Sequence, residues 1–120
     1  MTDLTTHKGG CHCGAVTYEA DIALDQVIAC NCSHCYAKGF QLTFTTPDKF
    51  RLVSGEDRLK SYKFNRHVID HRFCDTCGVQ AFGLGKSPDG MDMIAINIRT
   101  LSDIEPNTVE THPFDGRHKF

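Results

Sequence analysis

The chain has little net charge and no long apolar run, and each absence excludes a class of protein. Its 120 residues carry a formal net charge of -2. That argues against a large nucleic-acid interface, because such interfaces need a basic face. No run is long and apolar enough to cross a bilayer, so no membrane span is predicted. Residues 1–10 are polar and lack the apolar core of a secretory signal peptide. We therefore expect a protein of the reducing cytoplasm.

Short β-like runs separated by turn residues follow one another along the chain. The expected strands cover residues 15–20, 26–30, 41–45, 50–57, 59–64, 68–73, 79–83 and 93–99, and a short helix is predicted at 33–38. Alternation of polar and apolar residues in several runs is typical of strands with one buried face. The phenylalanines expected in the core are Phe40, Phe44, Phe50, Phe64, Phe73 and Phe82. The pattern predicts a mainly β fold in a single domain spanning residues 1–120.

Cysteine, in contrast, is abundant, and its seven residues fall into three tight groups. The groups are Cys11-His12-Cys13, then Cys30-Asn31-Cys32-Ser33-His34-Cys35, then Cys74-Asp75-Thr76-Cys77. Disulfide scaffolds usually carry cysteines one at a time. Metal sites pair them, because a tight turn must direct two thiolates at one ion. The odd count and a reducing compartment also favour thiolate–metal ligation over disulfides.

The first and third groups together supply four ligands, the number that closes a structural zinc site. Cys11 and Cys13 are two residues apart, so in an extended segment both sulfurs would lie on one face. Cys74 and Cys77 have the spacing of a metal-binding knuckle, and Gly78 can take the positive φ that such a turn needs. We expect these four cysteines to hold a zinc ion that contributes directly to folding.

The middle group, Cys30, Cys32 and Cys35, supplies three ligands and leaves a fourth position open. A thiol entering that position would be deprotonated by the metal. Zinc held there could also polarise a carbonyl oxygen as a Lewis acid. The spacing therefore favours an open site suited to chemistry, and a total of two zinc ions per chain.

Other interpretations of the cysteines stay open at this point. Both clusters could be structural, with His34, His12 or another histidine completing the second one. Residues 32–35 form a C-x-x-C on their own, so the middle group could be a redox-active or metal-sensing thiol pair. A non-catalytic zinc scaffold that binds a protein or small ligand would carry the same cysteines.

Few other residues indicate chemistry. His34 lies between two of the middle cysteines and is the best candidate for a fourth ligand or a close neighbour of the site. His67 and His71 would share a face of an expected strand, but no helix supports them as a metal pair. Three basic side chains could meet the carboxylates of a charged thiol ligand, which needs counter-charges: Lys38, Arg66 and Arg72.

The three cysteine motifs resemble, in order and spacing, those of the glutathione-dependent formaldehyde-activating enzyme family, to which centromere protein V also belongs. The stretches that carry the resemblance are Gly9-Gly10-Cys11-His12-Cys13-Gly14-Ala15-Val16, Cys30-Asn31-Cys32-Ser33-His34-Cys35 and Phe73-Cys74-Asp75-Thr76-Cys77-Gly78. The resemblance extends from about Lys8 to Phe114-Asp115-Gly116-Arg117, an ending similar to that of short family members.

This resemblance implies a mostly β, zinc-stabilised fold similar to that of peptide methionine sulfoxide reductase B. It implies a structural zinc on Cys11, Cys13, Cys74 and Cys77, and a catalytic zinc on Cys30, Cys32 and Cys35. The implied reaction condenses glutathione with formaldehyde to S-(hydroxymethyl)glutathione, a carbon–sulfur lyase activity. The expected partners are a small-molecule thiol and a small aldehyde. No cysteine follows Cys77, so the resemblance to the reductase is one of fold alone.

Overall fold

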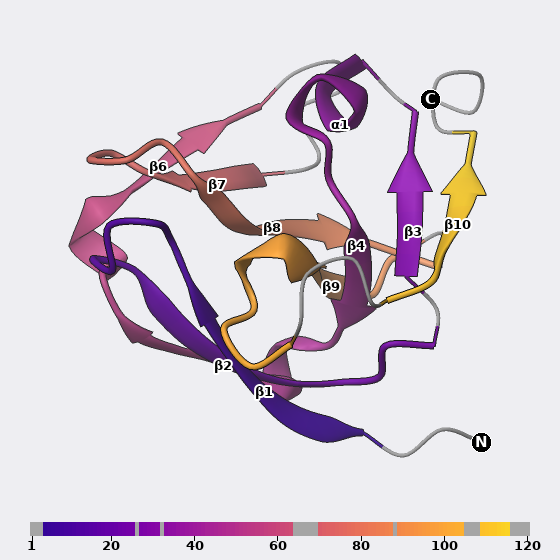
Figure 1. Ribbon diagram of the computed structural model, residues 1–120, viewed down its shortest axis with the longest axis horizontal. Helices are drawn as coiled ribbons and strands as arrows, with labels where there is room; N and C mark the ends of the chain where they lie inside the picture. Colours follow the sequence, from indigo (N-terminus) through magenta and orange to yellow (C-terminus); the bar gives the residue numbers. More distant parts are fainter. Residues whose placement is uncertain are drawn as a thin grey trace.

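The computed structural model describes residues 4–25, 27–31, 33–63, 70–87, 89–104 and 109–115. Within these ranges the chain is mainly β, as predicted, with one short helix (Figure 1). The strands are β1 Thr5–Gly10, β2 Thr17–Ile22, β3 Val27–Cys30, β4 Leu42–Thr45, β5 Phe50–Ser54, β6 Leu59–Tyr62, β7 Asp70–Cys74, β8 Gln80–Lys86, β9 Asp92–Asn97 and β10 Thr111–Phe114. The helix is α1 Ser33–Lys38, and 3-10 turns lie at η1 Pro47–Lys49, η2 Glu56–Arg58 and η3 Ile98–Thr100.

These strands form two sheets in the described part of the chain. One has three strands in the order β1-β2-β5, and the other has seven in the order β10-β3-β4-β9-β8-β7-β6. Neighbouring strands pair antiparallel, except that β10 joins β3 in parallel. Figure 1 shows β3 and β10 side by side, with α1 near the end of β3. The late strand β10 therefore lies beside the segment that carries the middle cysteines.

The main core joins the two sheets. Strand β2 buries alternate residues, Tyr18, Ala20 and Ile22, because successive side chains of a strand point to opposite faces. They cluster with Ile94 and Ile96 of β9 and with further buried residues of the larger sheet. Burial of this cluster is the main hydrophobic contribution to stability.

Strand β4 corrects one prediction about the core. Phe44 is 45% exposed, whereas its neighbours Thr43 and Thr45 are buried. The threonine hydroxyls donate to the backbone carbonyls of Ala23 (3.3 Å) and Asp21 (3.0 Å). The threonines therefore face the segment around the end of β2, and Phe44 points to the opposite face of the sheet. Leu42, on the same face as Phe44, is also buried and packs with Phe40, so both faces of β4 are partly covered and Phe44 lies at an uncovered position.

Other predicted elements are present with the predicted type, but their first or last residues differ. The helix expected at 33–38 is α1, and the strand expected from 79 begins at Gln80 and runs to Lys86. The run expected at 50–57 ends at Ser54, before the 3-10 turn η2. Two strands, β1 and β10, were not predicted. Strand β1 is polar, and β10 has only four residues and contains Pro113, which strands tolerate at an edge. Phe40 and Phe82 are buried, Phe50 and Phe73 are partly buried, and Phe64 lies outside the described residues.

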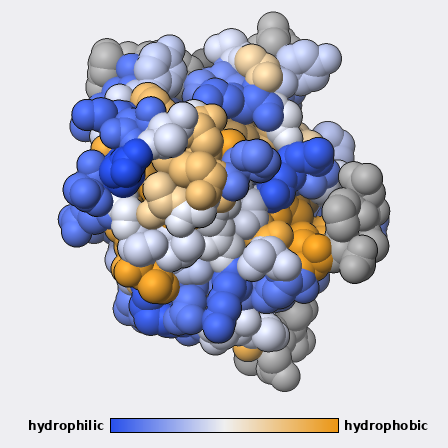
Figure 2. Space-filling model, turned by 60° about the vertical axis from the view of Figure 1, so that its left-hand side comes forward, coloured by the Kyte–Doolittle hydropathy of each residue, from blue (hydrophilic) through white to orange (hydrophobic). Residues whose placement is uncertain are grey.

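The surface is mixed in character. Figure 2 shows one face of the molecule, where apolar patches are separated by hydrophilic residues. No helix in the described ranges is both long and apolar enough to cross a membrane.

Candidate metal centres

Cys11 and Cys13 lie in the tight turn between β1 and β2. Backbone hydrogen bonds close this turn, from Cys11 N to Val16 O (3.0 Å) and from Gly14 N to Cys11 O (3.3 Å). The amide of Val16 also donates to Cys11 Sγ (3.3 Å). A turn, rather than the alternation of an extended segment, brings the two sulfurs to 3.6 Å.

Cys74 and Cys77 lie in the turn between β7 and β8. Gly78 N donates to Cys74 O (2.9 Å), and Cys74 N donates to Val79 O (3.0 Å). The amide of Thr76 donates to Cys74 Sγ at 3.4 Å, which stabilises negative charge on the sulfur. Gly78 has a φ of 79°, a left-handed conformation that residues with a Cβ adopt only at a cost. The knuckle predicted from the spacing is thus present, with its glycine in the predicted conformation.

The two turns bring four sulfur atoms together. The Sγ atoms of Cys11, Cys13, Cys74 and Cys77 all lie within 4.8 Å of one another. Cys13 Sγ lies 3.6 Å from Cys74 Sγ. Tetrahedral zinc with Zn–S bonds of about 2.3 Å would hold its sulfurs roughly 3.8 Å apart. These four cysteines could therefore hold one metal ion, as the sequence predicted, and such an ion would join the three-stranded sheet to the seven-stranded sheet.

The sulfurs of this cluster differ in their readiness to ionise. Burial opposes ionisation of Cys77, but backbone amides, that of Val79 first, lower the pKa of its thiol to about 6. Backbone amides around Cys77 and Thr76 likewise lower the pKa of Cys74. The amide of Ala15 favours the Cys13 thiolate, yet hydrogen bonds with neighbouring thiols and burial raise the pKa of Cys13 to about 11. A divalent cation would favour the thiolate form of all four.

An ion pair supports the second turn from outside. Arg58 Nε donates to Asp75 Oδ1 (3.0 Å), and the amide of Asp75 donates to Arg58 O (2.8 Å). Arg58 also contacts the hydroxyl of Thr76. Leu52 and Leu59 pack against the buried cysteines of the cluster. The surroundings fix the direction of the ligands, as a structural metal site requires.

The middle cysteines lie in a different cluster. Cys30 is the last residue of β3 and Cys35 lies on α1, and both are buried, at 8% and 7% exposure. They pack together with Phe40 and Leu42. Cys32 lies outside the described residues. The structure thus brings two of the three predicted ligands of the second site into one apolar cluster, apart from the four-sulfur cluster.

Strand β10 fastens this second cluster from the far end of the chain. Phe114 pairs in register with Cys30 and packs against the cluster. Asn31, the residue after Cys30, donates from its backbone amide to Phe114 O (3.1 Å). Its side-chain Nδ2 donates to Asp115 Oδ1 (3.1 Å). The sequence assigned no chemistry to Asp115, and no local pattern around it indicates a contact with Asn31.

His34 occupies the first turn of α1, next to a second histidine that the sequence did not connect with it. The ring centroids of His34 and His71 lie 4.1 Å apart. Burial, and then nearby Lys38, lowers the pKa of His34. Burial, and then His34, lowers the pKa of His71 to about 4. Both rings are therefore neutral near pH 7.

The structure does not bring the three basic residues together as counter-charges for a thiol ligand: one is paired, one is exposed, and one lies outside the described residues. Arg72 Nε donates to Asp70 Oδ2 at 2.8 Å, so its charge is already paired. Lys38 is exposed at the end of α1. Arg66 and His67 lie outside the described residues.

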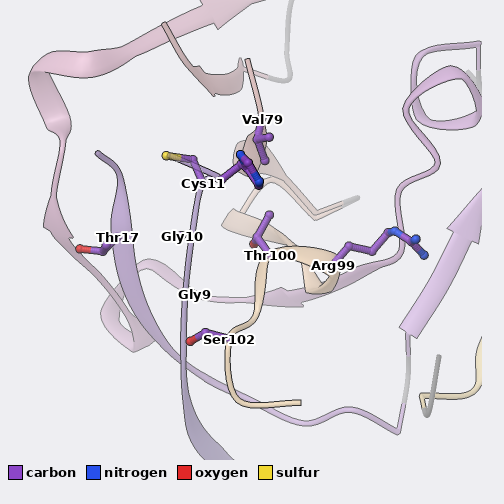
Figure 3. A pocket seen from close by; sticks show the side chains of 9 residues that line it. Gly9, Gly10, Cys11, Thr17, Val79, Arg99, Thr100 and Ser102 are labelled. Atoms are coloured by element: carbon purple, nitrogen blue, oxygen red, sulfur yellow. The ribbon is translucent and has the colours of Figure 1, made fainter. Parts of the chain in front are cut away.

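A surface hollow lies beside the four-sulfur cluster rather than beside the middle cysteines. Its lining includes Gly9, Gly10, Cys11, Val79 and Thr100 (Figure 3). The side chain of Arg99, which also borders the hollow, extends away from Cys11 in this view. Arg99 therefore does not bring its charge toward Cys11.

Two comparisons with known proteins place the chain among its relatives. The sequence profile of the glutathione-dependent formaldehyde-activating enzyme family matches residues 6–115, a range that includes all three cysteine groups. The chain is also similar to a Rhodobacter sphaeroides protein whose crystal structure was determined as a structural genomics target, with 27% sequence identity and a TM-score of 0.76. That similarity covers 88% of this chain and 99% of the other. The chain belongs to the glutathione-dependent formaldehyde-activating enzyme family.

Proposed function

We propose that this chain is a zinc-dependent enzyme of the carbon–sulfur lyase type. It would join a thiol, glutathione or one like it, to a small aldehyde such as formaldehyde, or cleave the resulting S-hydroxymethyl adduct. Membership of a family named for glutathione-dependent formaldehyde activation supports this reaction class. The observation that carries the proposal is the separation of the cysteines into a four-sulfur cluster and a second, buried cluster around Cys30 and Cys35.

The four-sulfur cluster would hold the structural zinc of a single domain spanning residues 1–120. Its ligands come from two turns that lie 61 residues apart in sequence, between Cys13 and Cys74. Closing a loop of that length restricts the unfolded chain more than closing a short one. Cysteines persist as thiols in a reducing compartment, which supports a cytoplasmic location in this proposal.

The second cluster would be the reaction centre, with Cys30, Cys32 and Cys35 holding a catalytic zinc. That ion would supply a position in which an incoming thiol loses its proton. The apolar cluster around Cys30 and Cys35 limits the access of water, which strengthens electrostatic interactions at the site.

The reaction forms one sulfur–carbon bond. The thiol releases its proton to water, the thiolate sulfur attacks the aldehyde carbon, and the carbonyl electron pair moves onto oxygen. The oxygen then takes a proton from water, so no net proton is gained or lost. Holding thiol and aldehyde side by side would be the main source of rate, because it removes the entropy cost of their encounter.

Exchange spectroscopy with ¹³C-formaldehyde and glutathione tests the proposal. We expect the wild-type chain to accelerate adduct formation, and Cys32→Ser and Cys35→Ser to lower that acceleration by about 100-fold or more. Ala37→Ser, an exposed position on α1, is the matched control and keeps the wild-type rate.

A zinc-loaded chain that accelerates no thiol–aldehyde exchange would contradict the enzyme proposal and favour a binding scaffold. A Cys32–Cys35 disulfide that forms with loss of zinc would favour a redox role.

A further inference from the structure

Two buried polar side chains, His71 and Gln80, take no part in the proposed reaction. His71 on β7 is 6% exposed and Gln80 on β8 is 5% exposed. The strand register places Tyr62 opposite His71, and His71 opposite Gly83. Partners in register point to the same side of a sheet, so these three residues form a row across one face of the larger sheet.

His34 of α1 packs onto this row. Its ring centroid lies 4.1 Å from that of His71 and 5.4 Å from that of Tyr62. The ring of Phe40, just beyond the helix, lies 5.5 Å from it. The His71 ring is the nearer of the two, and it is buried whereas Tyr62 is 49% exposed. His71 is therefore the main packing partner of His34 on the sheet.

Gln80 fixes the orientation of the His71 ring. Gln80 Nε2 lies 3.2 Å from His71 Nδ1. An amide nitrogen only donates, so Nδ1 accepts and the ring hydrogen is assigned to Nε2. Asn97 Nδ2 in turn donates to the backbone carbonyl of Gln80 (2.9 Å). A Cβ at Gly83 would lie at ordinary contact distance from Gln80 Nε2 (3.6 Å) and His71 Nδ1 (3.9 Å), so Gly83 adjoins this pair.

Helix α1 needs such support because it has only six residues. Helices of that length are unstable alone in water and depend on packing. Cys35 is buried in the apolar cluster, and Phe40 N donates to Cys35 O (3.1 Å) at the end of the helix. His34 provides the ring contacts of the first turn. The helix is thus anchored by Cys35 on the apolar cluster and by His34 on His71.

We propose that His71 and Gln80 are positioning residues for the middle cysteine group: Gln80 orients the ring of His71, which supports His34 and so holds the first turn of α1. Since Cys35 follows His34 directly in the chain, the support fixes the turn that presents Cys35 beside Cys30. The link from this support to catalysis rests on the proposed function, whereas the support itself can be tested without turnover.

Thiol labelling of the full chain as purified tests the support directly. We expect iodoacetamide to modify Cys35 roughly tenfold faster or more in His71→Ala, with Cys11 and Cys74 unchanged, because only local opening of α1 becomes easier. His71→Phe keeps a ring against His34 and restores slow labelling. His112→Asn, an exposed histidine on β10, is the control. Equal labelling of Cys35 in wild type and His71→Ala would overturn the proposal. So would faster labelling of every cysteine, which indicates general unfolding.

Cobalt titration of the zinc-stripped chain then links the support to the metal site. We expect two thiolate–cobalt absorption changes in wild type, and the weaker one to require about 10- to 100-fold more cobalt in His71→Ala. His71→Phe would recover most of that loss. Unchanged cobalt affinities in His71→Ala would overturn the positioning role. A wild-type chain that binds a single cobalt ion would overturn the proposed function, while the labelling result would still decide the support.

Discussion

Phe114 on β10 lies in register with Cys30, the last residue of β3, although 84 residues separate them in sequence. The two strands run parallel. Just after this pair, Asn31 makes two further hydrogen bonds, one to Phe114 and one to Asp115. Asn31, the residue after Cys30, is therefore held by hydrogen bonds to the late strand and to Asp115. Its position at the second cluster depends on β10.

Removal of the Asp115 carboxylate tests this dependence. Asp115→Ala deletes the acceptor for Asn31 Nδ2 at an exposed position, so we expect a loss of about 1 kcal/mol or less in the free energy of unfolding. The affinity of the middle cysteines for zinc should fall by about tenfold, because the segment that carries them is less constrained. Chelator competition measures that affinity, with Glu110→Gln as the exposed control on the same segment. An affinity equal to that of wild type would show that β10 does not position the site.

The four-sulfur cluster predicts a different response to the loss of one ligand. We expect Cys74→Ser to unfold the chain or strongly lower its melting temperature, because it opens a site that ties the two sheets together. Cys35→Ser should keep a cooperative melt, because the second site does not join the sheets. Circular dichroism melts of both variants make the comparison. A native-like melt in Cys74→Ser would contradict the structural role.

A substitution at Gly55 tests how rigid the turn between β1 and β2 is, because an added Cβ would clash with that turn. Gly55 has a φ of 93°, and a Cβ there would lie 2.3 Å from the carbonyl oxygen of Ala15. Gly90 has a φ of 88° with nothing within 4 Å of its Cβ position, which makes it a matched control. Gly90→Ala should cost about 1 kcal/mol for the left-handed backbone alone. Gly55→Ala should cost at least about 2 kcal/mol more. Urea unfolding measures the loss in the free energy of unfolding for both variants. Equal losses would mean that the turn carrying Cys11 and Cys13 moves to accommodate the added methyl group.

Acid should weaken the fold through His71. Burial, and then His34 and Lys38, lowers the pKa of His71 to about 4, with Asp70 opposing, while its unfolded value is about 6.5. The unfolded chain therefore binds a proton more readily between these pH values. The stability from keeping the ring neutral is fully present above about pH 6.5 and is lost as pH falls toward 4. At pH 5 the loss amounts to about 2 kcal/mol.

Comparison with His71→Phe isolates this contribution. Urea unfolding at pH 7 and pH 5 should show a larger loss for wild type than for His71→Phe, because Phe cannot take up the proton. Both proteins carry the same cysteines, so protonation of the thiolate ligands is common to both. Parallel losses in the two proteins would contradict the buried, neutral state of His71.

The sequence predicts the cysteine chemistry better than it predicts the neighbours of the cysteines. The spacing of Cys74 and Cys77 fixes a local turn, and Gly78 follows them with the positive φ that the turn needs. Local patterns of this kind depend on a few consecutive residues. They could therefore be recognised without knowledge of the fold.

Contacts between distant segments could not be recognised in this way. The approach of His34 to His71 depends on where α1 packs on the sheet. The pairing of Phe114 with Cys30 depends on a parallel strand with no pattern of its own. The burial of Thr43 and Thr45, beside the exposed Phe44, accompanies hydrogen bonds to carbonyls near the end of β2. Each of these contacts depends on the tertiary arrangement. The local pattern of apolar residues in the sequence does not predict that arrangement.

The most direct test of the central claim is the zinc content per chain, measured before and after mild chelation. We expect two zinc ions per chain, one of which is removed easily while the circular dichroism spectrum and cooperative melt persist. Cys35→Ser should then contain one tightly held ion. A single zinc ion in the wild-type chain, or two that leave only as the fold is lost, would contradict the division into a structural and a reactive site.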